Sequence, residues 1–374
     1  MDFELNDEQR MLSDSAARLF TDRYTFETRI AALKSAEGWS RDLWSAMAEM
    51  GLLGIGLPEA HGGLGGTGVE TMIVAEAVGR ALVVEPWLAT VVLAGGALRH
   101  GGSAAQQEAR IPRIVAGEHV MALAHGEPGL PRYATDARVT RATHVGERWT
   151  LSGRKQAVLH GGSADELVVS AQTDNATALF LVDARSTGVR RETVTGYDGV
   201  PVSAIEFAAA DAELLGDAGD GATVLARVLD EATAALCAEA VGAMAETVDL
   251  TIDYLKTRQQ FGVALGSFQA LQHRAVDMFI QVELARSMAI HAALSTDAAA
   301  GERALNVGAA KVQIGKAGRM VGQNAVQLHG AIGFTAEYKV GHLFKRLTAI
   351  DALCGDSDHH LAAIARTGGL PELA

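Results

Sequence analysis

Two short segments of the sequence combine residue types suited to holding a nucleotide. In TRQQFG, residues 257–262, Arg258 stands three residues before the aromatic Phe261. A guanidinium can donate two parallel hydrogen bonds to phosphate oxygens, and an aromatic ring can pack against a flat heterocycle. In QLHGAIGFTAEY, residues 327–338, a helical stretch ends in small residues, which lets a bulky ligand approach the backbone closely.

Two glycine-rich stretches accompany these segments: GIGLPEAHGGLGG at residues 54–66 and LSGRKQAVLHGG at residues 151–162. Taken singly, each of the four motifs also has a simpler interpretation. Arg258 fits a surface ion pair, Gln327 fits a solvated helix end, and the glycine stretches fit ordinary turns. A single motif therefore does not indicate a function; only the order and separation of all four along the chain can do so.

The first part of the chain is predicted to position its glycine loop between helices. Apolar residues recur at helical spacing through residues 7–20, 44–52, 71–82 and 88–100. The glycines of residues 54–66 prevent a regular helix and predict a tight loop. Residues 1–116 are thus expected to be helical.

The pattern changes to strands in the middle of the chain and returns to helix afterwards. Short β-rich runs include ERWTLSG, ELVVSAQT, TALFLVDA and VSAIEF, and Thr173-Asp174-Asn175 is expected to make a hairpin turn. Helical periodicity then continues through residues 268–294, 309–327 and 342–366, as in a helical bundle. The fold class is therefore mainly α with a central β domain.

Composition and charge restrict the partners of this protein. The formal net charge is −13, and such a surface repels the phosphate backbone of nucleic acids. Cys237 and Cys354 show neither CxxC nor Cys/His spacing, so no metal site is expected and a reducing compartment fits. The first residues lack the plan of a signal peptide, and charged residues interrupt the most apolar stretch, residues 71–98. We expect a cytoplasmic protein without nucleic-acid, membrane or metal partners.

In this order and at these separations, the motifs resemble those of the acyl-CoA dehydrogenase family across nearly the whole chain. The family's RxxFG element is similar to Arg258–Gly262, and its P-E-x-x-G-G loop to Pro58–Gly63. Its Q-x-x-G-G-x-G-F turn is similar to Gln327–Phe334, with Ala331 in place of the second glycine. Residues 237–278 are particularly similar to the small subunits of heteromeric members, such as pimeloyl-CoA dehydrogenase and the actinobacterial enzymes of sterol side-chain breakdown.

The resemblance implies an N-terminal helical domain at 1–116, a middle β-barrel-like domain at 117–220 and a C-terminal four-helix bundle at 221–374. It implies FAD as the cofactor: a carboxylate takes the α-proton of an acyl-CoA thioester while the flavin takes the β-hydride. In this fold, the RxxFG element and the glycine turn reach the pyrophosphate and adenine side of the FAD in the neighbouring subunit, and the flavin ring contacts the β domain of its own subunit. The cofactor-binding residues implied in this way are Arg258, Gln260, Phe261, Phe268, Gln327 and Gly330.

The sequence departs from the family at the catalytic base. The family's glutamate usually lies in a Tyr-Glu-Gly-Thr segment before the last helix ends, and the matching stretch here reads LCGDSD. Its position is taken by Cys354 when the alignment runs back from the last helix, and by Gly355 when it runs forward from Arg346. No Lys, Arg or His precedes Cys354 closely enough in sequence to lower its pKa, so we expect a structural cysteine.

Some family members carry the base on the helix that leads to RxxFG instead. That position holds Ala232 here, with Glu231 one residue before it. A shift of one residue turns a helical side chain by ~100°, so we expect Glu231 to be solvated or ion-paired. No catalytic residue is therefore expected in this chain, and Glu231, Asp356 or Asp358 are the alternatives as a displaced base.

The elements that contact the flavin ring are altered as well. The family's Thr-Glu-Pro and Trp-Ile-Thr elements are replaced by residues 126–128, Gly-Glu-Pro, and residues 157–159, Ala-Val-Leu. Both threonine positions lose their hydroxyl, and each lost hydrogen bond to a buried polar ring edge costs ~1–3 kcal/mol. The tryptophan that shields the flavin is replaced by Ala157.

These departures favour a weakly or non-catalytic small subunit of a heteromeric, FAD-dependent acyl-CoA dehydrogenase, in an α2β2 assembly. The chain would complete the ADP side of the FAD site in a larger partner subunit, with an acyl-CoA substrate and electron-transfer flavoprotein as further partners. A steroid, dicarboxylate or fatty acyl group would each fit, in β-oxidation or steroid degradation. One alternative is a self-sufficient homo-oligomer with Glu231 or Asp356 as base; another is a flavin-free structural or CoA-binding scaffold, against which the retained Arg258, Phe261 and Gln327 weigh.

Overall fold

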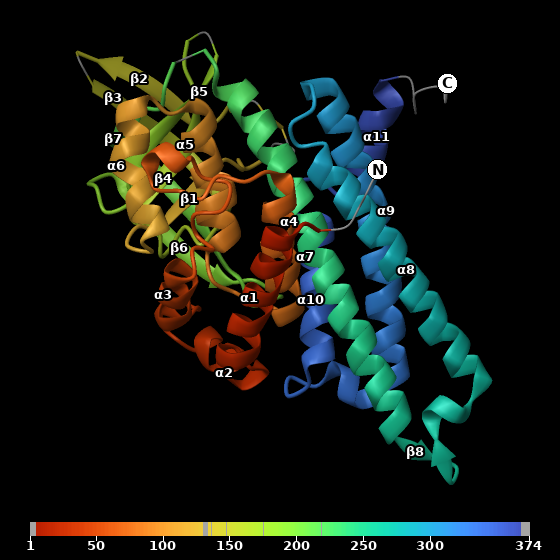
Figure 1. The fold of residues 1–374 in the computed structure, drawn as a ribbon. Coiled ribbons are helices and arrows are strands. Elements are labelled where there is room, and N and C mark those ends of the chain that lie inside the picture. Colours follow the sequence, from red (N-terminus) through yellow and green to blue (C-terminus); the bar gives the residue numbers. More distant parts are fainter. Residues whose placement is uncertain are drawn as a thin grey trace. The chain divides into compact units, whose positions relative to one another are not determined.

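The structure is a computed structural model that describes residues 5–129, 134–135, 137–146, 148–174, 176–217 and 219–367. The chain forms two compact units, which are described separately. Of the described residues, the first unit takes those up to 27, 67–83 and those from 233 on, and the second takes 28–66 and 84–232. Figure 1 shows the elements in chain order.

Side-chain caps explain where several of the N-terminal helices begin. Asn6, Thr67 and Ser103 each precede a helix and exchange hydrogen bonds with the residue three positions on. These bonds satisfy backbone N–H groups that the first helical turn leaves free. The helix predicted over residues 88–100 is π-helical in η2 (Leu88–Ala94) and α-helical only in α5. The other elements here are α1 (Asp7–Arg23), α2 (Phe26–Leu33), α3 (Arg41–Glu49), η1 (Glu59–His61), α4 (Gly68–Ala81), α5 (Gly95–Gly101) and α6 (Ala104–Val115).

The glycine stretch at residues 54–66 forms the tight loop that its composition predicts. The Gly56 N–H donates to the Gly65 carbonyl at 2.6 Å, which closes the loop on itself. A Cβ atom at Gly63 would lie 2.2 Å from the carbonyl oxygen of Leu57. Only glycine therefore allows this approach of the two backbone segments.

The strands form a seven-stranded sheet that closes on itself. Their order is β1-β4-β2-β3-β7-β5, with β6 beside β7 and β5 paired back to β4. The ring of β4, β2, β3, β7 and β5 is a small barrel, which confirms the β domain that the resemblance implies. Its interior is filled by apolar side chains such as Leu151, Phe180 and Ile205. The strands are β1 (Met121–Ala124), β2 (Arg141–Val145), β3 (Arg148–Leu159), β4 (Glu166–Gln172), β5 (Thr177–Asp183), β6 (Val189–Thr195) and β7 (Pro201–Leu214).

The hairpin predicted at Thr173 is confirmed. Strands β4 and β5 pair antiparallel, with Gln172 opposite Thr177. The N–H and the hydroxyl of Thr173 both donate to the carbonyl of Ala176, at 2.9 and 2.8 Å. Asn175, the third residue of the predicted turn, lies outside the described residues.

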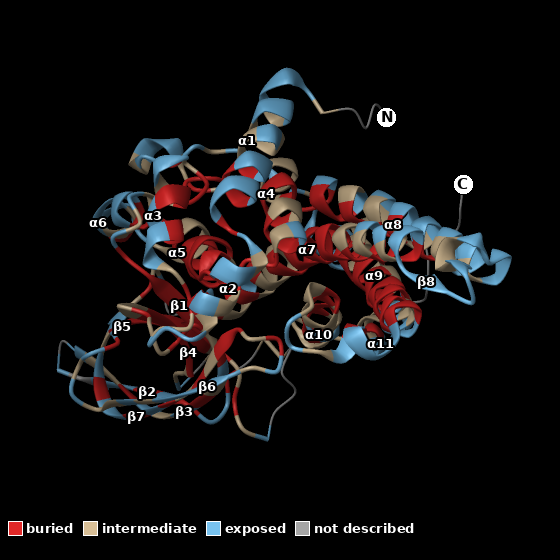
Figure 2. Ribbon diagram, turned by 90° about the horizontal axis from the view of Figure 1, so that it is seen from below, coloured by how far each residue is buried: buried red, intermediate tan, exposed pale blue. Residues whose placement is uncertain are grey.

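Long helices make up most of the first unit. Helix α9 is buried along much of its length and packs against α8, α10 and α11, whereas most residues of α8 are exposed (Figure 2). The mainly helical class with a helical C-terminal part is thus confirmed. Helix α7 (Gly221–Thr257) belongs to this unit from residue 233 on. The other elements are β8 (Gln259–Gln260), β9 (Val263–Ala264), η3 (Leu265–Ser267), α8 (Gln269–Leu294), α9 (Ala300–His329), η4 (Gly330–Phe334), α10 (Lys339–Ala352) and α11 (Ser357–Arg366).

The prediction of a single last helix over residues 342–366 is wrong. Helix α10 ends at Ala352 and α11 begins at Ser357. Between them Cys354 and Gly355 have φ values of 53° and 103°, which a right-handed helix cannot contain. The periodicity continues across the break because both helices bury a face in the same unit.

Candidate functional site

The end of α7 presents Arg258 on the surface. Its N–H donates to the Tyr254 carbonyl at 2.8 Å, and its own carbonyl accepts from the N–H of Leu265 at 2.8 Å. The hairpin of β8 and β9 carries Phe261 at its tip, 91% exposed. Within the described residues the Arg258 guanidinium makes no ion pair, so it is not engaged as the simpler interpretation expects.

The end of α9 presents the second segment. Gln327 is exposed in the last turn, and Gly330 follows the helix with a φ of 65°, a value that favours glycine. The turn η4 then leaves Phe334 74% exposed. Both segments thus offer polar and aromatic groups to a ligand or to another chain.

Tyr254 and His329 bring the two segments together. Their rings stack with centroids 4.5 Å apart and an interplanar angle of 27°. Tyr254 lies one helical turn before Arg258, and His329 lies two residues after Gln327. The six residues predicted to bind FAD all belong to the first unit and all are exposed: Arg258, Gln260, Phe261, Phe268, Gln327 and Gly330.

A buried lysine fixes the loop between α10 and α11, where the family's base is expected. The Lys311 ammonium of α9 donates to the carbonyls of Asp351, Leu353 and Gly355, at 3.0, 2.7 and 2.5 Å. Burial lowers the pKa of Lys311, and three carbonyl acceptors use all three of its N–H groups. Nε2 of His360 lies 3.0 Å from the Cys354 carbonyl and donates to it. No basic residue closely precedes Cys354 in the sequence, but the fold places Lys311 of α9 against its loop.

The loop geometry distinguishes the two alignments of the base position. A Cβ atom at Gly355 would lie 2.4 Å from Nε2 of His360, and the φ of 103° disfavours any side chain there. Cys354, half-buried, is thus the position at which this loop has room for a side chain. Its neighbour Asp356 caps α11 by accepting from the N–H of His359 at 2.8 Å, and Asp358 is exposed.

Glu231 is enclosed by two arginines and a histidine within the second unit. Nε2 of His100 lies 2.8 Å from its carboxylate, Nε of Arg227 lies 3.2 Å away, and Arg99 forms a further ion pair. Burial would raise the pKa of Glu231, but the His100 hydrogen bond and the charge of Arg99 outweigh it and lower the pKa. Arg99 also donates to the Gly56 carbonyl, so the cluster ties the glycine loop to α7. This arrangement matches the ion-paired interpretation, and it makes the carboxylate a weak proton acceptor.

The first of the two segments that replace the family's flavin-ring elements, residues 126–128, lies directly against Gln156, the residue that precedes the second. The N–H of Gln156 donates to the Gly126 carbonyl at 2.8 Å, and its side-chain amide donates to the Glu127 carbonyl at 3.0 Å. A Cβ atom at Gly126 would lie 2.8 Å from the Gln156 carbonyl oxygen. A threonine at position 126 would therefore require the backbone to move, so this contact does not fit the ring-binding residues of the family.

A buried ion pair lies behind these segments. The Lys155 ammonium donates to Glu127 at 2.8 Å and to Ser170 at 2.9 Å, and both charged side chains are at most 2% exposed. Burial raises the pKa of Glu127, but Lys155 and the N–H groups of Arg138 and Val139 outweigh this and lower the pKa to about 2. The pair thus fixes the backbone around residues 126–128 without exposing a reactive group.

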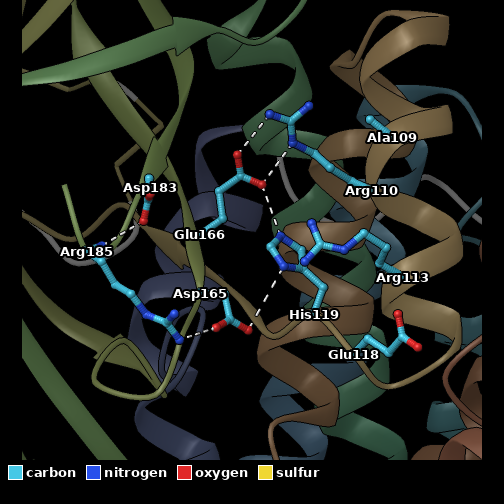
Figure 3. A pocket seen from close by; sticks show the side chains of 9 residues that line it. All are labelled: Ala109, Arg110, Arg113, Glu118, His119, Asp165, Glu166, Asp183 and Arg185. Carbon is cyan, nitrogen blue, oxygen red and sulfur yellow. Dashed lines mark hydrogen bonds and ion pairs between the residues drawn. The ribbon is translucent and has the colours of Figure 1, made fainter.

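A polar pocket of about 420 Å³ opens in the second unit at a place that the sequence does not indicate (Figure 3). Arg110 donates to both carboxylate oxygens of Glu166, at 2.8 and 2.9 Å. Nε2 of His119 lies 3.1 Å from Glu166, and Arg185 pairs with Asp165 at 2.9 Å. Most of the charged side chains that line the pocket are thus paired with one another, as in a structural ion-pair network. It is lined by Ala109, Arg110, Arg113, Glu118, His119, Asp165, Glu166, Asp183 and Arg185.

The described residues offer neither a metal site nor a membrane span. No group of three or more His, Cys, Asp or Glu side chains in them is arranged to hold a metal ion. None of the helices described is both long and apolar enough to cross a membrane.

Comparison with known proteins identifies three consecutive family models. The acyl-CoA dehydrogenase N-terminal domain matches residues 6–118, the middle domain residues 122–210 and the C-terminal domain residues 219–369. The 3-sulfinopropanoyl-CoA desulfinase of Paraburkholderia xenovorans is 31% identical, covering 89% of this chain and 88% of its own.

Two solved structures share the fold over nearly their whole length. The "Tcur3481-Tcur3483 steroid ACAD G363A variant" has a TM-score of 0.88 and 31% identity, covering 96% of this chain and 97% of that chain. The ChsE4-ChsE5 complex from Mycobacterium tuberculosis has a TM-score of 0.89 and 28% identity, covering 99% of this chain and 100% of that chain. Each of these two structures is named for a pair of proteins.

Proposed function

Because this chain belongs to the acyl-CoA dehydrogenase family, whose members are FAD-dependent oxidoreductases, we propose that it is the small subunit of a heteromeric acyl-CoA dehydrogenase. In this role it contributes little or no catalysis of its own and completes the ADP side of the FAD site in a larger partner chain. FAD supplies the hydride acceptor there. The proposed division into domains is 1–116, 117–220 and 221–374.

One contrast within the chain carries the proposal. The exposed Arg258 and Gln327 fit a pyrophosphate on a neighbouring chain, since a free guanidinium can donate two parallel hydrogen bonds to it. The base position holds Cys354, the Glu231 carboxylate is engaged by its ion-pair partners, and Gly126 lies against the Gln156 carbonyl. Such a chain has free side chains for the ADP part of FAD but lacks a base and the usual contacts to the flavin ring. It is therefore better suited to bind FAD held by a partner than FAD of its own.

The surface of the first unit supports association with another chain. Four apolar residues of α8 are 47–54% exposed. Phe261 and Phe334, in the segments that carry Arg258 and Gln327, are still more exposed. Large apolar side chains gathered on one surface mark an interaction site more often than a solvated face. The α8 residues are Val276, Phe279, Ile280 and Leu284.

The substrate and location are part of the same proposal. The substrate is an acyl-CoA thioester, and a steroid acyl group is the first to test, because one of the two structural neighbours is a steroid ACAD variant. Electron-transfer flavoprotein is the proposed electron acceptor. The free Cys237 and Cys354 fit a reducing, cytoplasmic location.

Co-expression with a candidate larger chain tests this function. Alone, the chain should purify without flavin colour or remain insoluble, because its apolar surface is then uncovered. Together, the two chains should form a complex that binds one FAD per pair and dehydrogenates acyl-CoA. A yellow, active homo-oligomer of this chain alone would support the self-sufficient alternative instead. A stable complex without flavin would support the scaffold.

A further inference from the structure

His329 lies between two tyrosine rings at the junction of three helices of the first unit. Its ring stacks on Tyr254 of α7, with centroids 4.5 Å apart at 27°, and it meets Tyr338 at 5.1 Å and 50°. Tyr338 immediately precedes α10, and His329 is the last residue of α9. His329 is 3% exposed and thus lies in the interior, whereas the two tyrosines are half-buried.

The imidazole acts there as a neutral ring. Its Nδ1 lies 2.8 Å from the carbonyl of Ala325, and a carbonyl can only accept, so Nδ1 carries the hydrogen. Burial lowers the pKa of His329, which keeps the ring uncharged at neutral pH. Nε2 is buried without a hydrogen-bond partner in the described part of the chain. The side chain therefore interacts with the two tyrosines through packing of its ring rather than through hydrogen bonds.

These faces join the two segments proposed to hold the nucleotide. The carbonyl of Tyr254 accepts the hydrogen bond of the Arg258 N–H, so a shift of Tyr254 also shifts Arg258. On the other side, His329 lies between the exposed Gln327 and Gly330, whose positive φ starts the η4 turn. The stack is thus a direct link between the turn that presents Arg258 and the turn that presents Gln327.

We propose that His329 is a positioning residue that holds Arg258 and Gln327 at the spacing needed to bind one pyrophosphate together, a role that rests on the proposed function. A ring of the same shape preserves the stack, whereas truncation to alanine leaves a cavity into which α7 and α9 can shift. Loss of the correct spacing between Arg258 and Gln327 weakens ligand binding, although His329 itself is not proposed to contact the ligand.

The test measures FAD retention of the assembled flavoprotein after dialysis at low free FAD. His329→Ala should weaken FAD binding about tenfold, equivalent to ~1.4 kcal/mol. His329→Phe should stay within about twofold of the parent protein, because it keeps a flat ring against Tyr254, at the cost of the single Nδ1–H bond to the Ala325 carbonyl. Met278→Ala is the matched control, since it opens a cavity at a fully buried site of α8 in the same unit.

A double-mutant cycle separates this role from simple destabilisation. If His329 acts through Arg258, the His329→Ala effect should largely disappear in the Arg258→Ala background. Equal loss of FAD from His329→Ala and Met278→Ala, or from His329→Phe, would overturn the positioning role while leaving the proposed function intact. Full FAD retention by Arg258→Ala would overturn the proposed function and this role with it.

Discussion

Arg346 of α10 and Glu239 of α7 form a bidentate ion pair in the interior of the first unit. The two nitrogen–oxygen distances are 2.6 and 3.0 Å, and both side chains are less than a tenth exposed. Helix α4 also approaches α7 closely at this point: a Cβ atom at Gly79 of α4 would lie 1.9 Å from the Glu239 carbonyl oxygen. The carboxylate of Glu239 is thus deeply buried and relies on Arg346 for its charge compensation.

Removal of one partner of this pair should destabilise the protein strongly. Arg346→Met leaves the Glu239 carboxylate buried and uncompensated, and the free energy of unfolding should fall by about 3–5 kcal/mol. Urea unfolding measures it. Arg319→Met is the control, because Arg319 pairs with Asp351 at the surface and its loss should cost less than about 1 kcal/mol. Equal effects of the two substitutions would contradict the prediction.

The polar pocket of Figure 3 should contribute to stability in a pH-dependent way. Burial raises the pKa of Glu166, but the hydrogen bonds from His119 and Arg110 outweigh it and lower the pKa from 4.5 to about 2. A carboxyl whose pKa is lower in the folded state stabilises that state above about pH 4.5. The contribution is lost as the pH falls through about 2.

Glu166→Gln should therefore lower stability at neutral pH and flatten the decline of stability between pH 4.5 and pH 2. The measurement is the free energy of unfolding across this range, in the parent protein and the variant. Glu118→Gln, an exposed carboxyl of the same pocket, should leave the slope nearly unchanged. An unchanged slope for Glu166→Gln would show that the carboxyl titrates alike in the folded and unfolded states.

Two of the three displaced-base alternatives, Glu231 and Asp356, can be tested together. Glu231→Gln and Asp356→Asn should each keep the turnover of the complex within a factor of ~3, whereas loss of a true general base costs ~10²–10⁴-fold. The physical reason is that two arginines and His100 already hydrogen-bond the Glu231 carboxylate, while Asp356 caps α11, a role that asparagine also fills. Steady-state turnover with unchanged FAD content is the measurement. A hundredfold loss from either change would make that residue the base.

The loop between α10 and α11 should tolerate change at one of its two central positions. Gly355→Ala places a Cβ atom against His360 at a strongly positive φ, and the free energy of unfolding should fall by about 2–4 kcal/mol. Cys354→Ala should stay within about 1 kcal/mol, since alanine adopts the same backbone and leaves the carbonyl contacts of the loop in place. Denaturant unfolding of both variants compares the two sites. The reverse order would return the base position to Gly355.

The sequence by itself determined those features that neighbouring residues along the chain decide. Helical spacing and β-rich runs predicted the succession of helices, β domain and helical bundle. Thr173-Asp174 predicted the β4–β5 hairpin, because a turn is a local event. The glycines of residues 54–66 predicted a tight loop, since their backbone freedom is a property of the residues themselves. The order and separation of the motifs were enough to recognise the resemblance to the acyl-CoA dehydrogenase family.

Tertiary structure alone decided what depends on partners far apart in the chain. The apolar period of residues 342–366 continues across Cys354, but the helix breaks there because Lys311, on another helix, binds the carbonyls of the loop. The surroundings of Glu231 come from Arg99 and His100, which lie more than a hundred residues away in sequence. A periodicity records which face of an element is buried; it does not record which side chain of another element fills that face.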